Sequence, residues 1–548
     1  MPRRKTVAGV PADLATIARD VGSLLAMQAG LMALSVVVAA LARERYAAVG
    51  FLLAAVVTFG AGIGARRRFA AAPEPRMKHG MVVAAAGWFA TAVFGALPLL
   101  LTAHLTPAAV AAGFVPAGAD YAPSLLVFRD PLHALFESMS GWTGSGLTMA
   151  VHEPSLPRTV QWWRSLVQYV GGVGVIVLTV SILSRPGSGS YALYRSETRE
   201  ERIHPSIVST VRTVWKIFLL YTALSVVVLF LAIRTSDYGS ALPLWEVGWQ
   251  ALNHAMTALS TGGFSVTDGS IATYDSPLIE TVLIPVMTLG AIAFPVHYGV
   301  LKDRDLGRLR TDLQTRWLFV LLAVGTVGLS AQNLVALTDA FGGSADYARL
   351  GVVGLSAAQA DAVRDSVFQF VSALSCTGFQ SAPIGEWAAG GKLILAGAMT
   401  LGGAAGSTVG GLKIIRGYTI VRGIEWQFSR VFLPPNAVVN ARIDGRLLDR
   451  ETMEREFSEA AIVSLLWLLL LVASSLLLVN LAGPEFTYAD ALFEVASAQG
   501  NVGLSAGITG PTMPPLAEAA FVLNMWIGRL EIIPILVFAR SVLYGLNP

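Results

Sequence analysis

Ten apolar runs of nearly bilayer length divide this chain, and they constrain its fold more than any other feature. A transmembrane α-helix needs about 20 consecutive, mostly apolar residues. Of the 548 residues, 54% are hydrophobic and only 14% are charged, which is too apolar for an ordinary soluble domain. The runs predict an all-α polytopic membrane protein with ten spans, near residues 21–42, 47–64, 81–103, 165–184, 214–233, 277–300, 317–338, 392–421, 459–482 and 515–543.

Positive charges are sorted to one side of these spans. Of the 39 Lys and Arg residues, 28 lie in five segments, 1–20, 65–80, 185–216, 302–316 and 413–455. By the positive-inside rule we expect these segments and the N-terminus in the cytoplasm, and the protein in the cell (inner) membrane. A signal peptide is an alternative for the basic start, but the first run begins only near residue 21 and has full span length.

Glycine-rich turns recur four times, each behind an apolar segment that is too short to span. The turns read TGSGLT, STGGFS, SCTGFQ and NVGLSA, and the short segments before them are 131–142, 245–259, 362–374 and 488–498. Successive turns are 117, 115 and 125 residues apart, counted between Gly146, Gly263, Gly378 and Gly503. Such a nearly constant interval indicates an internal repeat.

The four turns have the composition of a cation filter. Inside a bilayer, non-helical backbone survives only where protein buries it or where it lines a watery path. A half-helix that ends there points its partly negative carbonyl end inward, and glycine leaves carbonyl oxygens free to replace an ion's hydration shell. Ordinary extracellular turns are the alternative, which fits one turn but not four. The predicted filter comprises Thr143, Gly144, Ser145, Gly146, Thr261, Gly262, Gly263, Cys376, Thr377, Gly378, Asn501, Val502 and Gly503.

The same residues carry a family resemblance. HAMTALSTGGFSVTDGSI, FESMSGWTGSGLT, LGGAAGSTVGGLKIIR, FEVASAQGNVGLSAGIT and GRLEIIPILV resemble motifs of the Trk/Ktr/HKT potassium transporter superfamily, over about residues 80–545. The two extra leading spans make the chain most similar to the bacterial TrkH type. One departure is Gly144, which stands where a threonine is usual, so the resemblance does not determine the outer geometry of that quarter of the filter.

The resemblance implies four helix–pore-loop–helix repeats in a pseudo-four-fold arrangement, in a chain that pairs as a homodimer. The expected units are two N-terminal helices in 1–78 and repeats in 79–205, 206–312, 313–445 and 446–548. It also implies a cytoplasmic ring of RCK-type, TrkA-like nucleotide-binding subunits as a regulatory partner. Topology-setting charge alone is the alternative reading of the basic cytoplasmic segments 185–215 and 413–455.

A second glycine-rich stretch predicts a gate. The run 392–421 is too long for one straight span, and paired glycines with Ser-Thr weaken its middle, so we expect a broken helix whose loop crosses the pore. Small-residue helix packing is the alternative. Arg529 lies within the last apolar run, where it either snorkels to the cytoplasm or faces this loop, and Glu531 is not expected as its partner. The gate residues are Gly402, Gly403, Gly406, Ser407, Thr408, Gly410, Gly411 and Arg529.

Together these features predict potassium uptake through a gated, channel-like pore, with K⁺ as the transported ion. A cation-coupled secondary transporter, a K⁺/Na⁺ or K⁺/H⁺ symporter, is the alternative, but it favours two inverted halves and buried coupling carboxylates. Glu137, Asp365 and Glu494 lie in the half-helices and are expected to fix packing and hydration rather than bind the ion. One cysteine excludes a disulfide framework, and no catalytic residues, organic cofactor or nucleic-acid partner are expected beside the membrane lipid.

Overall fold

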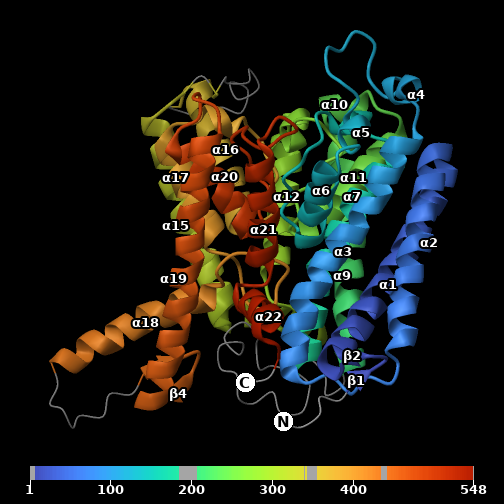
Figure 1. Cartoon of the computed structure of the whole chain (residues 1–548). Helices are drawn as coiled ribbons and strands as arrows, with labels where there is room; N and C mark the ends of the chain where they lie inside the picture. Colours follow the sequence, from blue (N-terminus) through green and yellow to red (C-terminus); the bar gives the residue numbers. More distant parts are fainter. Residues whose placement is uncertain (1–5, 184–206, 339, 342–354, 433–440, 547–548) are drawn as a thin grey trace.

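The computed structural model is a bundle of helices whose axes lie mostly along one common line (Figure 1). It describes residues 6–183, 207–338, 340–341, 355–432 and 441–546. Six described helices are long and apolar enough to cross a membrane, and two bent helix pairs bring the count to 8. The prediction of an all-α polytopic membrane protein is confirmed. The exceptions within the described ranges are two small hairpins, β1 (Thr6–Val7) with β2 (Val10–Pro11) and β3 (Ala441–Ile443) with β4 (Arg446–Leu448).

The two leading spans form an antiparallel pair beside the rest of the bundle. Helix α1 (Ala12–Leu41) packs along α2 (Arg45–Arg68), and both contact α3 (Met77–Leu105). A Cβ added to Gly22 or Gly62 would lie 2.7 Å from the other residue's carbonyl oxygen. Small residues therefore let these two backbones approach closely, as is common between helices in membranes.

Four units follow, each with an outer helix, a half-helix, a turn and an inner helix. Extended turns and short elements connect them: α4 (Ala108–Ala112), α5 (Ser124–Val127), η1 (Glu153–Ser155), α10 (Asp237–Ser240), η3 (Ser270–Tyr274), α14 (Arg308–Thr311) and η5 (Ile384–Glu386). The units are α3, α6 (Pro131–Thr143) and α7 (Arg158–Leu183); α9 (Ile207–Thr235), α11 (Leu244–Leu259) and α12 (Pro277–Ala291); α15 (Leu313–Val335), α16 (Ala357–Leu374) and α17 (Ala389–Thr400); α19 (Arg450–Leu481), α20 (Tyr488–Gly500) and α21 (Pro515–Arg529).

Three of the inner helices are broken. The expected break in 392–421 separates α17 from α18 (Ile414–Val431). We expected 277–300 and 515–543 to be single spans, and this was wrong. Helix α12 turns by 106° into α13 (Phe294–Asp303), and α21 turns by 113° into α22 (Ile533–Tyr544). Each new helix carries a proline in its first turn, and proline cannot continue the preceding helix. A hydropathy profile does not detect this break, because the run stays apolar.

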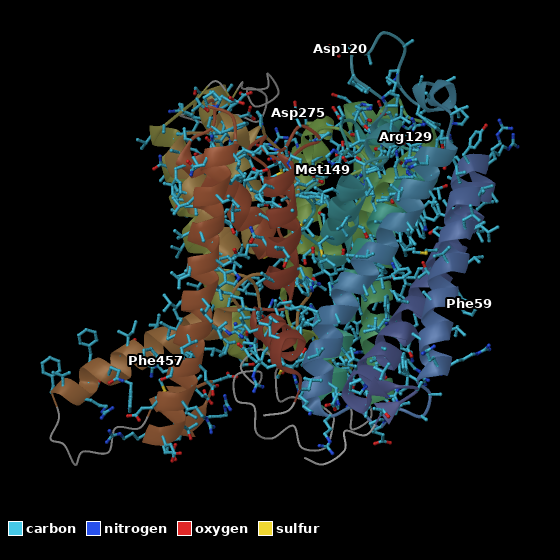
Figure 2. All side chains as sticks on the ribbon, in the orientation of Figure 1. Phe59, Asp120, Arg129, Met149, Asp275 and Phe457 are labelled. Atoms are coloured by element: carbon cyan, nitrogen blue, oxygen red, sulfur yellow. The ribbon has the colours of Figure 1, made fainter. Side chains whose placement is uncertain are left out.

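Helix α18 leaves the bundle sideways at the end where α22 and β4 lie (Figure 1). A Cβ on its Gly423 would meet the ring of Phe457 in α19, so the two helices cross in close contact. A small cluster around Trp426 holds α18 to the β3–β4 hairpin. Figure 2 labels Phe457 at this end and Asp120 and Asp275 at the opposite end. The basic segment 185–216 lies mostly outside the described residues.

Three ion pairs and one histidine–carboxylate hydrogen bond join each unit to the next. In each pair the inner helix of one unit contacts the half-helix of the following one, at 2.5 to 2.9 Å. The sign of the inner-helix charge alternates around the ring, and the last pair returns to the first unit. The pairs are Arg158–Glu246, Glu280–Arg364, Lys392–Asp490 and Glu518–His133. A closed circle of four similar units is the pseudo-four-fold arrangement that the repeats predicted.

Candidate functional site

The four glycine turns meet in a ring. Gly146, Gly263, Gly378 and Gly503 all have positive φ, from +74° to +108°, a conformation that glycine adopts without strain. A Cβ on each would lie within 2.5 Å of the carbonyl oxygen just before the next unit's glycine. These carbonyls belong to Gly262, Thr377, Val502 and Ser145. There is consequently no room for a side chain at any of the four positions, and backbone alone forms this ring.

The residue two places before each of these glycines also has positive φ. Gly144 has φ +73°, while Thr261, Cys376 and Asn501 have φ between +52° and +54°. The departure at Gly144 therefore leaves the path of the backbone like that of the other three turns. Cys376 is fully buried, with its thiol free.

Side chains between the turns hold the ring from outside. Ser145 accepts a hydrogen bond from the amide of Asn501 at 2.9 Å, which joins the first and fourth turns. Gln168 in α7 donates to the carbonyl of Gly262 at 2.6 Å and accepts from the N–H of Phe264 at 3.0 Å. A hollow of about 310 Å³ opens on the outer side, and all four ring glycines line it.

The break between α17 and α18 places a loop directly beneath this ring. Its backbone is held by α12, since the N–H of Ala404 donates to the carbonyl of Ala291 at 3.1 Å and that of Thr408 to Gly290 at 3.2 Å. The hydroxyl of Thr408 lies 2.9 Å from that of Thr261, so the loop touches the second glycine turn. A Cβ on Gly410 would lie within 2.5 Å of the carbonyl of Gly500, next to the fourth turn.

Arg529 reaches this loop from the end of α21. Its Nη1 donates to the carbonyl of Thr408 at 2.8 Å, and its Nη2 to Gly171 of α7 at 3.1 Å. The side chain is only 5% exposed, so it does not snorkel to the surface. Glu531, which the sequence did not favour as the partner of Arg529, pairs with Arg416 at 2.6 Å.

Comparisons with known proteins show the family of this chain. The sequence profile of the TrkH family, described as cation transport protein, matches residues 55–544. The chain belongs to the TrkH family. A TrkH relative from Methanocaldococcus jannaschii, an uncharacterized cation transporter, is 30% identical over 86% of this chain and 84% of its own. The Trk system potassium uptake protein TrkH of Escherichia coli K12 is 27% identical, over 85% of each chain.

The TrkH fold is also seen in a solved structure. The crystal structure of the potassium transporter TrkH from Vibrio parahaemolyticus matches with a TM-score of 0.75. The match covers 97% of this chain and 99% of that one, at 23% identity. Nearly the whole backbone path is therefore that of a TrkH protein.

Sequence reasoning missed several residues of this TrkH-family site. Lys413 bonds to the carbonyl of Val409 at 2.5 Å and lies 3.7 Å from Glu531, while Gln314 accepts from the N–H of Ala405 at 2.7 Å. The charged pair Lys413 and Arg416 directly after an apolar glycine run was the available signal. Gln168 and Gln314 gave none, because a glutamine in a helix is not unusual. Among the described residues, no cluster of three His, Cys, Asp or Glu could hold a metal ion.

Proposed function

We propose that this protein takes up K⁺ through a gated, channel-like pore whose filter is the ring of four glycine turns. The observation that carries the proposal is the ring itself, in which four backbone segments from four units meet with no room for side chains. Rings of backbone carbonyls can replace the hydration shell of an alkali cation. The printed names of the Escherichia coli and Vibrio parahaemolyticus relatives, which concern potassium, support the choice of ion.

In this proposal the loop from Gly402 to Gly411 and Arg529 form the gate. A fixed guanidinium below the filter repels cations, and the loop occupies the path directly beneath Thr261. Movement of α18 would pull on the loop, because α18 begins at Ile414, shortly after the loop ends at Gly411. The repeat boundaries near 79, 206, 313 and 446 are part of the same proposal.

A homodimer and a cytoplasmic TrkA-like nucleotide-binding ring are the proposed partners, with the N-terminus in the cytoplasm. The projecting helix α18 supports a docking role, because it leaves large apolar side chains exposed. Val421, Phe428 and Val431 are 54%, 65% and 76% exposed. Exposed apolar groups of this size are typical of interaction sites.

Flux into liposomes tests the function. Purified protein should carry K⁺ and Rb⁺ down their gradients in preference to Na⁺, with no need for a Na⁺ or proton gradient. Flux that requires one of these gradients would favour the alternative, a K⁺/Na⁺ or K⁺/H⁺ symporter, and no K⁺ flux at all would refute the proposal. Nucleotide-dependent flux on addition of a purified TrkA-like ring would support the partner.

A further inference from the structure

One position recurs in all four half-helices, nine residues before the ring glycine. The four side chains differ in chemistry but not in burial, since each is at most 1% exposed. They point away from the ring and toward the chain that leaves it. The residues at this position are Glu137, His254, Gln369 and Glu494.

In three units this side chain binds the hydroxyl two residues after the glycine. Glu137 accepts from Thr148 at 3.0 Å, His254 lies 2.9 Å from Ser265 through Nε2, and Glu494 accepts from Ser505 at 2.7 Å. The same hydroxyl accepts the N–H two residues further along, at 2.9 to 3.0 Å in all three units. Three repeats with different side chains at this position thus form the same closed loop beside the glycine turn.

The third unit keeps the contact in altered form. Gln380 occupies the hydroxyl position, and Gln369 instead donates to Ser381, one residue further, at 3.2 Å. Ser381 in turn donates to Asp365 at 2.8 Å. We call this hydrogen-bonded link from the half-helix to the segment after the turn the strut. It is a property of the repeat, and not of one residue type.

We propose that Glu137, His254, Gln369 and Glu494 are positioning residues that set the geometry of the filter's outer end and thereby its selectivity. They do not touch the ion. Each closes a loop from the half-helix to the exit of the turn, so the turn cannot widen or narrow without breaking a hydrogen bond of a buried side chain. The inference rests on the proposed function, because selectivity presupposes that the glycine ring is the filter.

The fourth unit offers the cleanest test. Glu137 also pairs with Arg164 at 2.6 Å, so its removal would leave the buried guanidinium of Arg164 without this carboxylate. The described partners of Glu494 are neutral, namely the hydroxyls of Ser505 and Thr509 and two backbone N–H groups. Glu494→Gln replaces one acceptor oxygen by a donor. Ser505→Ala removes the other end of the strut at a half-buried site, where misfolding is less of a concern.

The experiment measures the K⁺/Na⁺ permeability ratio of the full chain in liposomes. We expect Glu494→Gln and Ser505→Ala each to lower the ratio about tenfold, as the loss of one hydrogen bond to a charged group would. Ser505→Thr keeps the hydroxyl, as Thr148 does in the first unit, and should retain the parent ratio. Glu485→Gln removes an exposed carboxylate from the same unit and is the matched control.

A K⁺-selective parent with unchanged ratios in both strut variants would overturn the inference. Hydrogen exchange separates this failure from failure of the proposed function. The N–H groups of Ala506 and Thr509 donate to different carboxylate oxygens of Glu494, at 2.7 and 3.0 Å, so the one that faces the new amide nitrogen should exchange faster in Glu494→Gln than in the parent. Should the parent carry no K⁺, equal exchange in the two proteins would still overturn the strut, while faster exchange would support it.

Discussion

Arg529 donates a hydrogen bond from Nη1 to the carbonyl oxygen of Thr408 at 2.8 Å, joining α21 to the loop beneath the glycine ring. The same guanidinium bonds to Gly171 of α7, so it bridges the first, third and fourth units below the ring. Its Nε is buried without a described partner. Among the described residues, the hydrogen bonds of this guanidinium go to backbone carbonyls, and in the proposed gate its charge would oppose cation passage while its bonds hold the loop.

Removing this charge should open the path. We expect Arg529→Ala, or deletion of 404–409, to raise K⁺ flux about tenfold, since a hydrogen bond to a charged group is lost along with the repulsion. Flux into liposomes measures the effect. Arg540→Ala, which removes an exposed arginine from α22, should leave the flux unchanged. Unchanged or lower flux in a folded Arg529→Ala protein would refute the gate.

Adding a side chain to the glycine ring should alter ion preference. Gly146 has φ +77° and faces the carbonyl of Gly262 closely, so Gly146→Ser must displace the ring. Within the superfamily that the sequence resembles, serine at this place goes with sodium permeation, and we expect the K⁺/Na⁺ permeability ratio to fall about tenfold. Gly118→Ser is the control, because Gly118 shares a positive φ, +88°, but has open space around it. Equal ratios in Gly146→Ser and the parent would contradict the filter assignment.

Breaking one pair of the ionic circle should destabilise the fold. Lys392 and Asp490 are 7% and 5% exposed, and Lys392→Met would leave the carboxylate buried without this partner. We expect a loss of about 3 kcal/mol in the free energy of unfolding, measured in detergent by denaturant titration. The double variant Lys392→Met/Asp490→Asn should lose less than the sum of the single changes.

The matched control for this pair is Arg308→Met. Its ion pair with Asp303 is exposed, with side chains 47% and 42% accessible. Such surface pairs contribute about 0 to 1 kcal/mol. A loss in Lys392→Met no larger than that in Arg308→Met would mean that the circle of ion pairs does not stabilise the assembly of units.

The outer hollow should respond to alkaline pH. Burial raises the pKa of Glu153, which lines it, to about 8, against 4.5 for an ordinary glutamate. Between pH 7 and 9 this carboxyl loses its proton, so the hollow gains a negative charge that attracts cations. We expect K⁺ influx at low external K⁺ to rise over this interval in the parent and to stay flat in Glu153→Gln.

The same group predicts a change in stability. Because the pKa of Glu153 is raised in the folded protein, its neutral carboxyl contributes to the free energy of unfolding. This contribution is complete below pH 4.5 and is lost as pH rises through about 8. The unfolding temperature should therefore fall between about pH 4.5 and 8 in the parent but not in Glu153→Gln. Asp120→Asn, an exposed carboxyl at the same end (Figure 2), is the control and should behave as the parent.

Sequence by itself determined the class of fold and the residues of the ring. Span-length apolar runs allow few alternatives in a bilayer, since every backbone polar group must be satisfied within the chain. The repeated glycines pointed to positions where positive φ and close backbone approach leave no room for a side chain, and all four ring glycines have both properties. The break near Gly402 was predictable for a related reason, because paired glycines weaken a helix locally.

Only the tertiary structure decided which distant residues complete the site. The bends after Ala291 and Arg529 interrupt continuous apolar runs, and composition alone does not distinguish a bent helix from a straight one. The contacts of Arg529 with Thr408 and of Glu494 with Ser505 depend on how segments cross in space. Hydropathy and periodicity report the burial of a segment, whereas a hydrogen bond between distant residues requires the relative placement of two backbones, which packing sets.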